Sequence, residues 1–69
     1  MDARARLAAN LQRLRRDGGL SQERFALEHG FDRTYISGIE RGVRNPTLEI
    51  VQKLADALKV DVCKLLSEP

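Results

Sequence analysis

Apolar residues recur along the chain at intervals of three and four, which is the spacing of one face of an α-helix. Leu7, Leu11 and Leu14, near the N-terminus, are the clearest example. No stretch alternates apolar and polar residues in the way that a half-buried β-strand does. The pattern therefore predicts an all-α fold of five short helices, at about residues 3–16, 21–29, 32–41, 47–59 and 62–66.

Residues that favour helix ends separate these segments. Ser21, Asp32 and Thr47 precede the second, third and fourth segments, and each has a side-chain oxygen that can accept from the free amides of a first helical turn. Gly30 and Gly42 follow the second and third segments, where glycine readily takes the left-handed backbone that ends many helices. Both signals support the predicted boundaries, and the short loops between the segments favour a compact all-α domain.

The fourth segment has an apolar face of its own. We expect this face to consist of Leu48, Val51, Leu54, Ala55 and Leu58. Ile50 and Ala57 lie off that stripe, so they are candidates for contact with something other than the core of the same chain.

The second and third segments have a spacing that indicates a function. Two short helices that cross steeply need a small side chain where they come closest, and Ala26 provides one. The tight turn between them needs a positive φ, which Gly30 allows. Ile36 and Ile39 can then bury the inner side of the second helix. This spacing predicts a helix-turn-helix over about residues 21–41.

The stretch LSQERFALEHGFDRTYISGIERGVRNPTLEIVQKLADALKV, with the helix before it, resembles the lambda-repressor/Cro-like (XRE-type) family of bacterial and phage regulators. The resemblance covers nearly the whole chain. Within it, DRTYISGIERGVRNP is similar to the small controller proteins of restriction–modification systems. The resemblance implies a five-helix domain that binds double-stranded DNA as a homodimer, with a recognition helix from about Arg33 to Arg41 in the major groove.

The resemblance also implies which side chains meet the DNA. The expected base contacts are Arg33, Thr34, Ser37 and Gly38, and the expected contacts to the DNA backbone are Gln22, Tyr35, Arg44 and Asn45. Arg33 is the strongest candidate for reading sequence, because a guanidinium can donate two hydrogen bonds to one guanine. Gly38 has two interpretations: it lets backbone or a neighbouring side chain approach the DNA closely, or it is a tolerated weakness in the helix.

Other residues are expected to hold the structure together. The resemblance places Arg15 and Glu40 as an internal ion pair between the first helix and the end of the recognition helix. The expected dimer interface consists of apolar residues near the C-terminus: Ile50, Ala57, Val62, Cys63 and Leu66. We interpret Cys63 as a small, half-buried apolar residue, in preference to a redox switch at that interface.

Charge is unevenly distributed, although the net charge is only +2. Residues 1–45 hold nine arginines and no lysine against six acidic residues, which leaves +3. Residues 46–69 hold three lysines against four acidic residues, which leaves −1. Arginine is well suited to binding phosphate and guanine. The first two thirds are therefore compatible with a surface that faces a polyanion, and equally with a solvated helix surface.

Composition argues against other classes of protein. A chain of 69 residues has room for a single domain with a thin core, so residues 1–69 are expected to form one domain without a small-molecule pocket. One cysteine and one histidine, Cys63 and His29, offer no disulfide, metal site or catalytic set, and we expect no cofactor and no enzyme activity. No apolar run is long enough for a membrane span or signal peptide, which predicts a cytoplasmic protein.

The combined prediction is a homodimeric, sequence-specific transcriptional regulator that binds a pseudo-palindromic operator. The narrower resemblance implies a restriction–modification controller that regulates its own promoter. RNA polymerase is a further candidate partner, because activation would need a contact with it. The alternative is a protein-interaction module of the same fold, such as an antitoxin, in which DNA binding is secondary.

Overall fold

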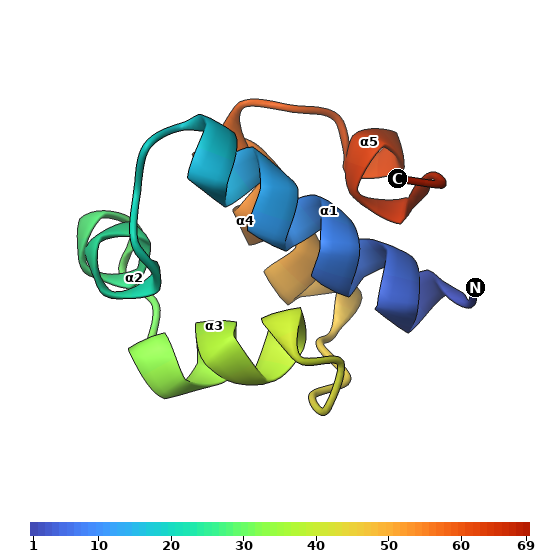
Figure 1. Ribbon diagram of the computed structural model, residues 1–69, viewed down its shortest axis with the longest axis horizontal. Helices are drawn as coiled ribbons and strands as arrows, with labels where there is room; N and C mark the ends of the chain where they lie inside the picture. Colours follow the sequence, from blue (N-terminus) through green and yellow to red (C-terminus); the bar gives the residue numbers. More distant parts are fainter.

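The computed structural model describes residues 1–69 as five α-helices joined by short loops (Figure 1). The helices are α1 (Ala3–Asp17), α2 (Gln22–His29), α3 (Arg33–Glu40), α4 (Leu48–Leu58) and α5 (Val62–Leu66). No residue is in a β-strand. The predicted all-α class is confirmed, and each predicted helix is present with ends within one residue of the expected ones.

The predicted N-caps are present. The side chains of Ser21, Asp32 and Thr47 each accept a hydrogen bond from an amide in the first turn of the helix that follows. Gly30 ends α2 in the left-handed conformation, with φ of 74°. The recognition helix is one residue shorter than predicted, because Arg41 is the C-cap of α3 and Gly42, with φ of 75°, follows it.

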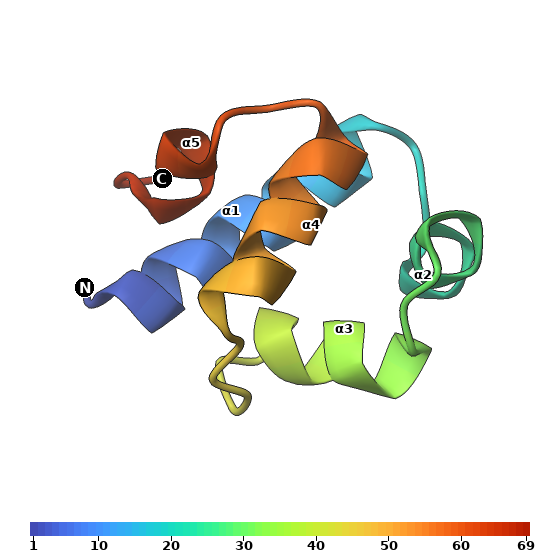
Figure 2. The same ribbon diagram turned by 180° about the vertical axis from the view of Figure 1, so that it is seen from behind.

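Helix α1 runs through the middle of the molecule and contacts α3, α4 and α5 (Figures 1 and 2). Helix α2 packs against α3, and α3 lies along one edge of the molecule. Each helix contributes to one core, formed by Leu7, Leu11, Phe25, Ala26, Ile36, Ile39, Val51, Leu54, Ala55 and Leu65. Burying one large apolar side chain of this kind contributes roughly 1.5–3 kcal/mol, so the core fixes where α3 sits.

A buried polar residue that the sequence pattern did not single out joins α1 to α5. The side chain of Asn10 is fully buried, and its Nδ2 donates to the carbonyl oxygens of Leu65, at 2.9 Å, and Ser67, at 2.8 Å. These are the orphan carbonyls at the end of a helix, which need donors from elsewhere. Asn10 therefore anchors the C-terminal end of α5 on α1.

Two predictions about burial are wrong. Leu48 is 80% exposed instead of belonging to the core face of α4, because it is the first residue of that helix and its side chain points beyond the packed turns. It lines a shallow depression of about 150 Å³ with Pro46 and Val51. Cys63 is exposed instead of half-buried, because the core side of the short α5 is occupied by Leu65.

None of the five helices is long and apolar enough to cross a membrane.

Candidate nucleic-acid interface

Helix α3 has one side in the core and one side open to solvent. Ile36 and Ile39 are at most 1% exposed, as the predicted spacing requires. Arg33 and Thr34, in the first turn, are exposed. The amides of Thr34 and Tyr35 donate to Asp32 Oδ1, at 2.7 and 3.2 Å, so this exposed first turn is well ordered by its cap. The N-terminal end of α3 is thus presented rigidly to the outside.

The other end of α3 is held by a buried ion pair. Arg15 Nε and Nη2 donate to the two carboxylate oxygens of Glu40, at 2.6 and 2.8 Å, and the two side chains are 6% and 1% exposed. Arg15 Nη1 donates to the carbonyl oxygen of Leu20 at 2.7 Å. The hydrogen bonds to Glu40 raise the pKa of Arg15, so its charge is permanent. The expected ion pair is present, and it joins α1, the following loop and α3.

Gln22, expected to contact a phosphate, is part of the same network. Its Nε2 donates to Glu40 Oε1 at 3.1 Å, and the residue is half-buried in the first turn of α2. This bond uses one of the two amide hydrogens of the Gln22 side chain. Gln22 therefore couples the start of α2 to the end of α3.

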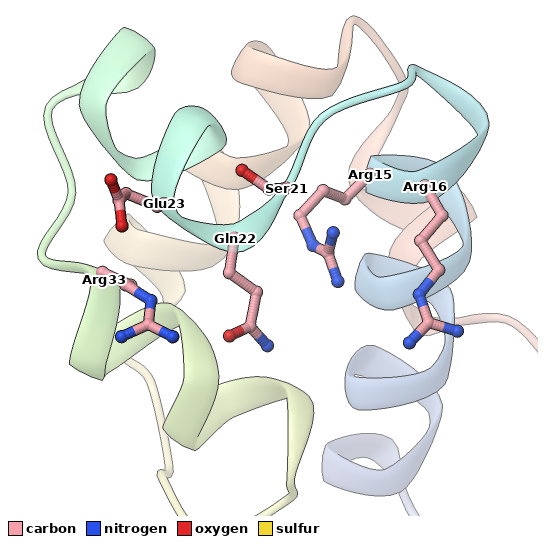
Figure 3. Close-up of a pocket in the computed structure, with 6 residues that line it drawn as sticks. All are labelled: Arg15, Arg16, Ser21, Gln22, Glu23 and Arg33. Carbon is pink, nitrogen blue, oxygen red and sulfur yellow. The ribbon is translucent and has the colours of Figure 1, made fainter.

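A polar hollow of about 490 Å³ lies beside the exposed turn of α3. It is lined by Arg15, Arg16, Ser21, Gln22, Glu23 and Arg33 (Figure 3). Glu40 neutralises Arg15, which leaves the positive charges of Arg16 and Arg33 against the single negative charge of Glu23. In Figure 3 the Glu23 carboxylate points away from the other polar groups. The hollow is therefore suited to an anion, and its lining combines Arg16 of α1, Gln22 of α2 and Arg33 of α3.

Tyr35 and Arg44 also come together. The Arg44 guanidinium carbon lies 5.6 Å from the centroid of the Tyr35 ring, within the range of a cation–π contact. Arg44 and its neighbour Asn45 are exposed, whereas Tyr35 and Ser37 are half-buried. These residues form a second polar group at α3, separate from the hollow.

Gly38, predicted as a base contact, is buried. The side chain of Arg44 lies over it, and a Cβ built on Gly38 would be 2.5 Å from Arg44 Cγ. The base contact expected at Gly38 stays a prediction, and in this structure the side chain of Arg44 covers the glycine. The neighbouring side chain named in the first interpretation of Gly38 is Arg44, which lies directly over the glycine.

Most of the residues expected at the dimer interface also pack within the chain. Ile50, Ala57, Val62 and Leu66 are partly buried against the core, so each has an intramolecular contact that the sequence pattern did not reveal. Cys63 stands out from them as an exposed residue, and its hydrogen bond and charge interaction with Asp61 raise its pKa, so that its thiol stays protonated at neutral pH.

The geometry is that of a helix-turn-helix DNA-binding domain: a first helix, a left-handed glycine turn, and a second helix with an exposed, arginine-flanked first turn. The chain belongs to the Helix-turn-helix family (HTH_3), which matches its residues 11–65. It is a helix-turn-helix transcriptional regulator of the XRE type, as its sequence indicates.

Three known proteins show where the chain lies within this family. Control protein C.SmaI from Serratia marcescens is 45% identical over 67 residues, which are 97% of this chain and 80% of that protein. The crystal structure of the hypothetical transcription factor NHTF from Neisseria has a TM-score of 0.92 at 44% identity, over 99% of this chain and 78% of that one. The predicted resemblance to controller proteins is confirmed.

The third protein was solved with DNA. It is the restriction–modification controller protein C.Esp1396I, a tetramer in complex with its natural 35 base-pair operator. Its TM-score is 0.79 at 29% identity, over 94% of this chain and 96% of that one. A protein of the same fold and nearly the same length is thus known in an oligomer on operator DNA.

Proposed function

We propose that this protein binds operator DNA sequence-specifically as a homodimer and controls the promoter of its own gene within a restriction–modification system. The observation that carries the proposal is the exposed first turn of α3, with Arg33 at its start and cationic groups on both sides. An α-helix with its side chains is about 10–12 Å across, which matches the roughly 12 Å width of the major groove.

The exposed side of α3 contacts the edges of the bases. Arg33 donates two hydrogen bonds to the O6 and N7 atoms of a guanine, which is the commonest specific contact in protein–DNA complexes. Thr34 follows it, also exposed, and offers a methyl group to thymine or a hydroxyl to a base. Ser37 is half-buried one turn later, so its reach is short.

Phosphate contacts flank the helix on two sides. On one side the hollow takes a phosphate between Arg16, Gln22 and the first amides of α2, where the helix dipole favours negative charge. On the other side Arg44 and Asn45 meet the DNA backbone, with Tyr35 beside them. Contacts of this kind fix the orientation of α3 in the groove but read no sequence.

The homodimer forms through α4 and α5. Cys63 is exposed on α5, and the partly buried Ile50 and Ala57 of α4 and Val62 and Leu66 of α5 retain some accessible apolar surface. A two-fold dimer presents two copies of α3, so its operator is pseudo-palindromic with half-site centres about 10 base pairs apart. The tetramer of C.Esp1396I on its operator supports an oligomeric binding unit.

Selection of bound sequences from random DNA, followed by footprinting, tests the DNA part of the proposal. We expect an enriched half-site, repeated with two-fold symmetry, and two chains per operator. The affinity should fall steeply as salt rises, because phosphate contacts release counterions. Failure to enrich any sequence, together with recovery of a stoichiometric protein partner, would favour the interaction-module alternative.

Dimerisation is tested separately by sedimentation equilibrium. Cys63→Arg should shift the protein towards monomer without changing its helical content, because Cys63 is exposed in the single chain. Leu27→Arg is the matched control, since Leu27 is 77% exposed on α2, outside the proposed interface. Equal association of both variants would contradict the assignment to α4 and α5.

Autoregulation is tested by placing the upstream DNA of the gene before a reporter, whose output should change with the wild-type protein and not with Arg33→Ala.

A further inference from the structure

Gly38 occupies a position where the backbone does not require glycine. It lies inside α3 and is not among the glycines with positive φ, which are Gly19, Gly30 and Gly42. Alanine is more favourable than glycine in a helix interior with ordinary backbone angles. A glycine here therefore needs an explanation in packing.

The chain after α3 folds back onto this glycine. The amides of Val43 and Arg44 both donate to the carbonyl oxygen of Gly38, at 3.0 and 3.2 Å. These two bonds hold the start of the α3–α4 loop against α3. They place Arg44 beside Gly38 although the two residues are six positions apart in sequence.

The side chain of Arg44 fills the space that a side chain at position 38 would need. A Cβ on Gly38 would lie 2.5 Å from Arg44 Cγ, 3.2 Å from Nε and 3.4 Å from Cδ. Real Cβ atoms essentially never come within 3.0 Å of another heavy atom, so any larger residue must displace Arg44. These three nearest atoms all belong to Arg44, so the close approach concerns this side chain and not the packing of α3 on the core.

Tyr35 holds the far end of the same side chain. It lies three residues before Gly38, on the neighbouring turn of α3, and its ring faces the Arg44 guanidinium at 5.6 Å. The stem of Arg44 thus crosses the helix at Gly38 and its charged end rests at Tyr35. Arg44 nevertheless remains exposed, so its charge is available to a ligand.

We propose that Gly38 is a positioning residue for Arg44. The absence of a side chain on Gly38 leaves a space, here called the seat, in which the stem of Arg44 lies along the outer face of α3. Tyr35 orients the guanidinium of Arg44 toward DNA bound at that face. A pre-positioned arginine loses less conformational freedom on binding than one that moves freely, which strengthens the complex. The inference rests on the proposed function, because it assigns how one of the DNA contacts is built.

The seat itself is testable without DNA. In the wild-type protein the Tyr35 ring current should shift the NMR signals of the Arg44 side chain, and Gly38→Ala should return them to random-coil positions. Thermal melting gives a second readout. Gly38→Ala should raise the melting temperature more in an Arg44→Ala background than in the wild type. In that background alanine keeps its higher helix propensity, and its methyl group no longer collides with the Arg44 side chain. Unchanged Arg44 signals in Gly38→Ala would overturn the proposal.

The consequence for binding is tested with the same variants on the selected operator. Gly38→Ala and Arg44→Ala should weaken binding by the same factor, and the double variant should be no weaker than either one, because both changes remove one contact. Each should lower the slope of log affinity against log salt by about 0.9, the value for one phosphate. Gly18→Ala is the matched control, since Gly18 caps α1 with ordinary backbone angles and should leave affinity unchanged.

Three outcomes of the binding experiment would overturn the proposal: wild-type affinity in Gly38→Ala, tighter binding in Gly38→Ala, or losses that multiply in the double variant. Failure of the proposed function gives a different result. In that case the wild-type protein selects no DNA sequence, while the NMR and melting differences between the variants persist.

Discussion

The two ends of α3 are built in opposite ways. At the N-terminal end Arg33 and Thr34 are exposed, and the cap from Asp32 is the main local restraint. At the C-terminal end the side chain of Glu40 is 1% exposed and binds both Arg15 and Gln22. One short helix thus combines an end that is free for contact with an end that Glu40 ties to α1 and α2.

The difference indicates how a thin domain can present a rigid reading surface. A functional side chain is useful when the element that carries it does not move, and the Glu40 network supplies that restraint away from the DNA. A buried ion pair of this kind does not by itself favour folding, because desolvating two charges offsets their attraction. Its value lies in the orientation that it imposes on α3.

The largest effect should come from breaking the locked end. Glu40→Ala leaves Arg15 buried without its partner, which should destabilise the fold by about 3–5 kcal/mol in chemical denaturation. The control is the double variant Arg15→Met with Glu40→Leu, which removes both charges and should recover much of that loss. A single variant as stable as the wild type would show that the network does not hold α3.

A smaller effect, on binding alone, should come from the free end. Arg33→Ala should cost roughly 1–3 kcal/mol of specific DNA binding and relax one base position, measured by titration against operator and single-base variants. Its folding stability should stay within about 0.5 kcal/mol of the wild type, because Arg33 is exposed. Equal and selective binding by this variant would remove Arg33 from the readout.

Removing the N-cap of α3, Asp32, should have a smaller effect. Asp32→Ala removes the acceptor for the amides of Thr34 and Tyr35, which should cost about 0.5–2 kcal/mol of stability. Asp32→Asn keeps an acceptor and should lose much less. If both variants melt at the same temperature, the first turn of α3 does not depend on this cap.

The smallest effect concerns a cap remote from α3. The amide of Cys63 donates to Asp61 at 2.8 Å, and this hydrogen bond lowers the pKa of Asp61 below its ordinary 3.8. A lowered pKa in the folded state means that the cap stabilises α5 above pH 3.8 and that this contribution disappears as the pH falls through the folded pKa.

Asp61→Asn keeps a capping oxygen but cannot titrate. The wild type should therefore melt slightly higher than Asp61→Asn at neutral pH, and the gap should close in acid. A gap that widens as the pH falls below 3.8 would contradict the assigned role.

Much of the fold was predictable because helix boundaries are local. A side-chain oxygen at Ser21, Asp32 or Thr47 meets amides two or three residues away, so sequence neighbours alone settle the geometry. The same holds for the glycine turn at Gly30. Burial was harder to predict from the sequence, as Leu48 and Cys63 demonstrate. Each is of a residue type that is common in protein cores, but its neighbours in space do not cover it.

By itself, the sequence determined the five helices, the helix-turn-helix and the family, since periodicity, caps and turn residues act over a few positions. Only the tertiary structure decided how Asn10 anchors α5, how Arg16 joins the hollow beside Arg33, and how Arg44 covers Gly38. The first two arrangements depend on where separate helices lie against one another, and the third depends on how the loop after α3 folds back onto that helix. That placement is set by packing of the whole core and not by the spacing of residues within any one segment.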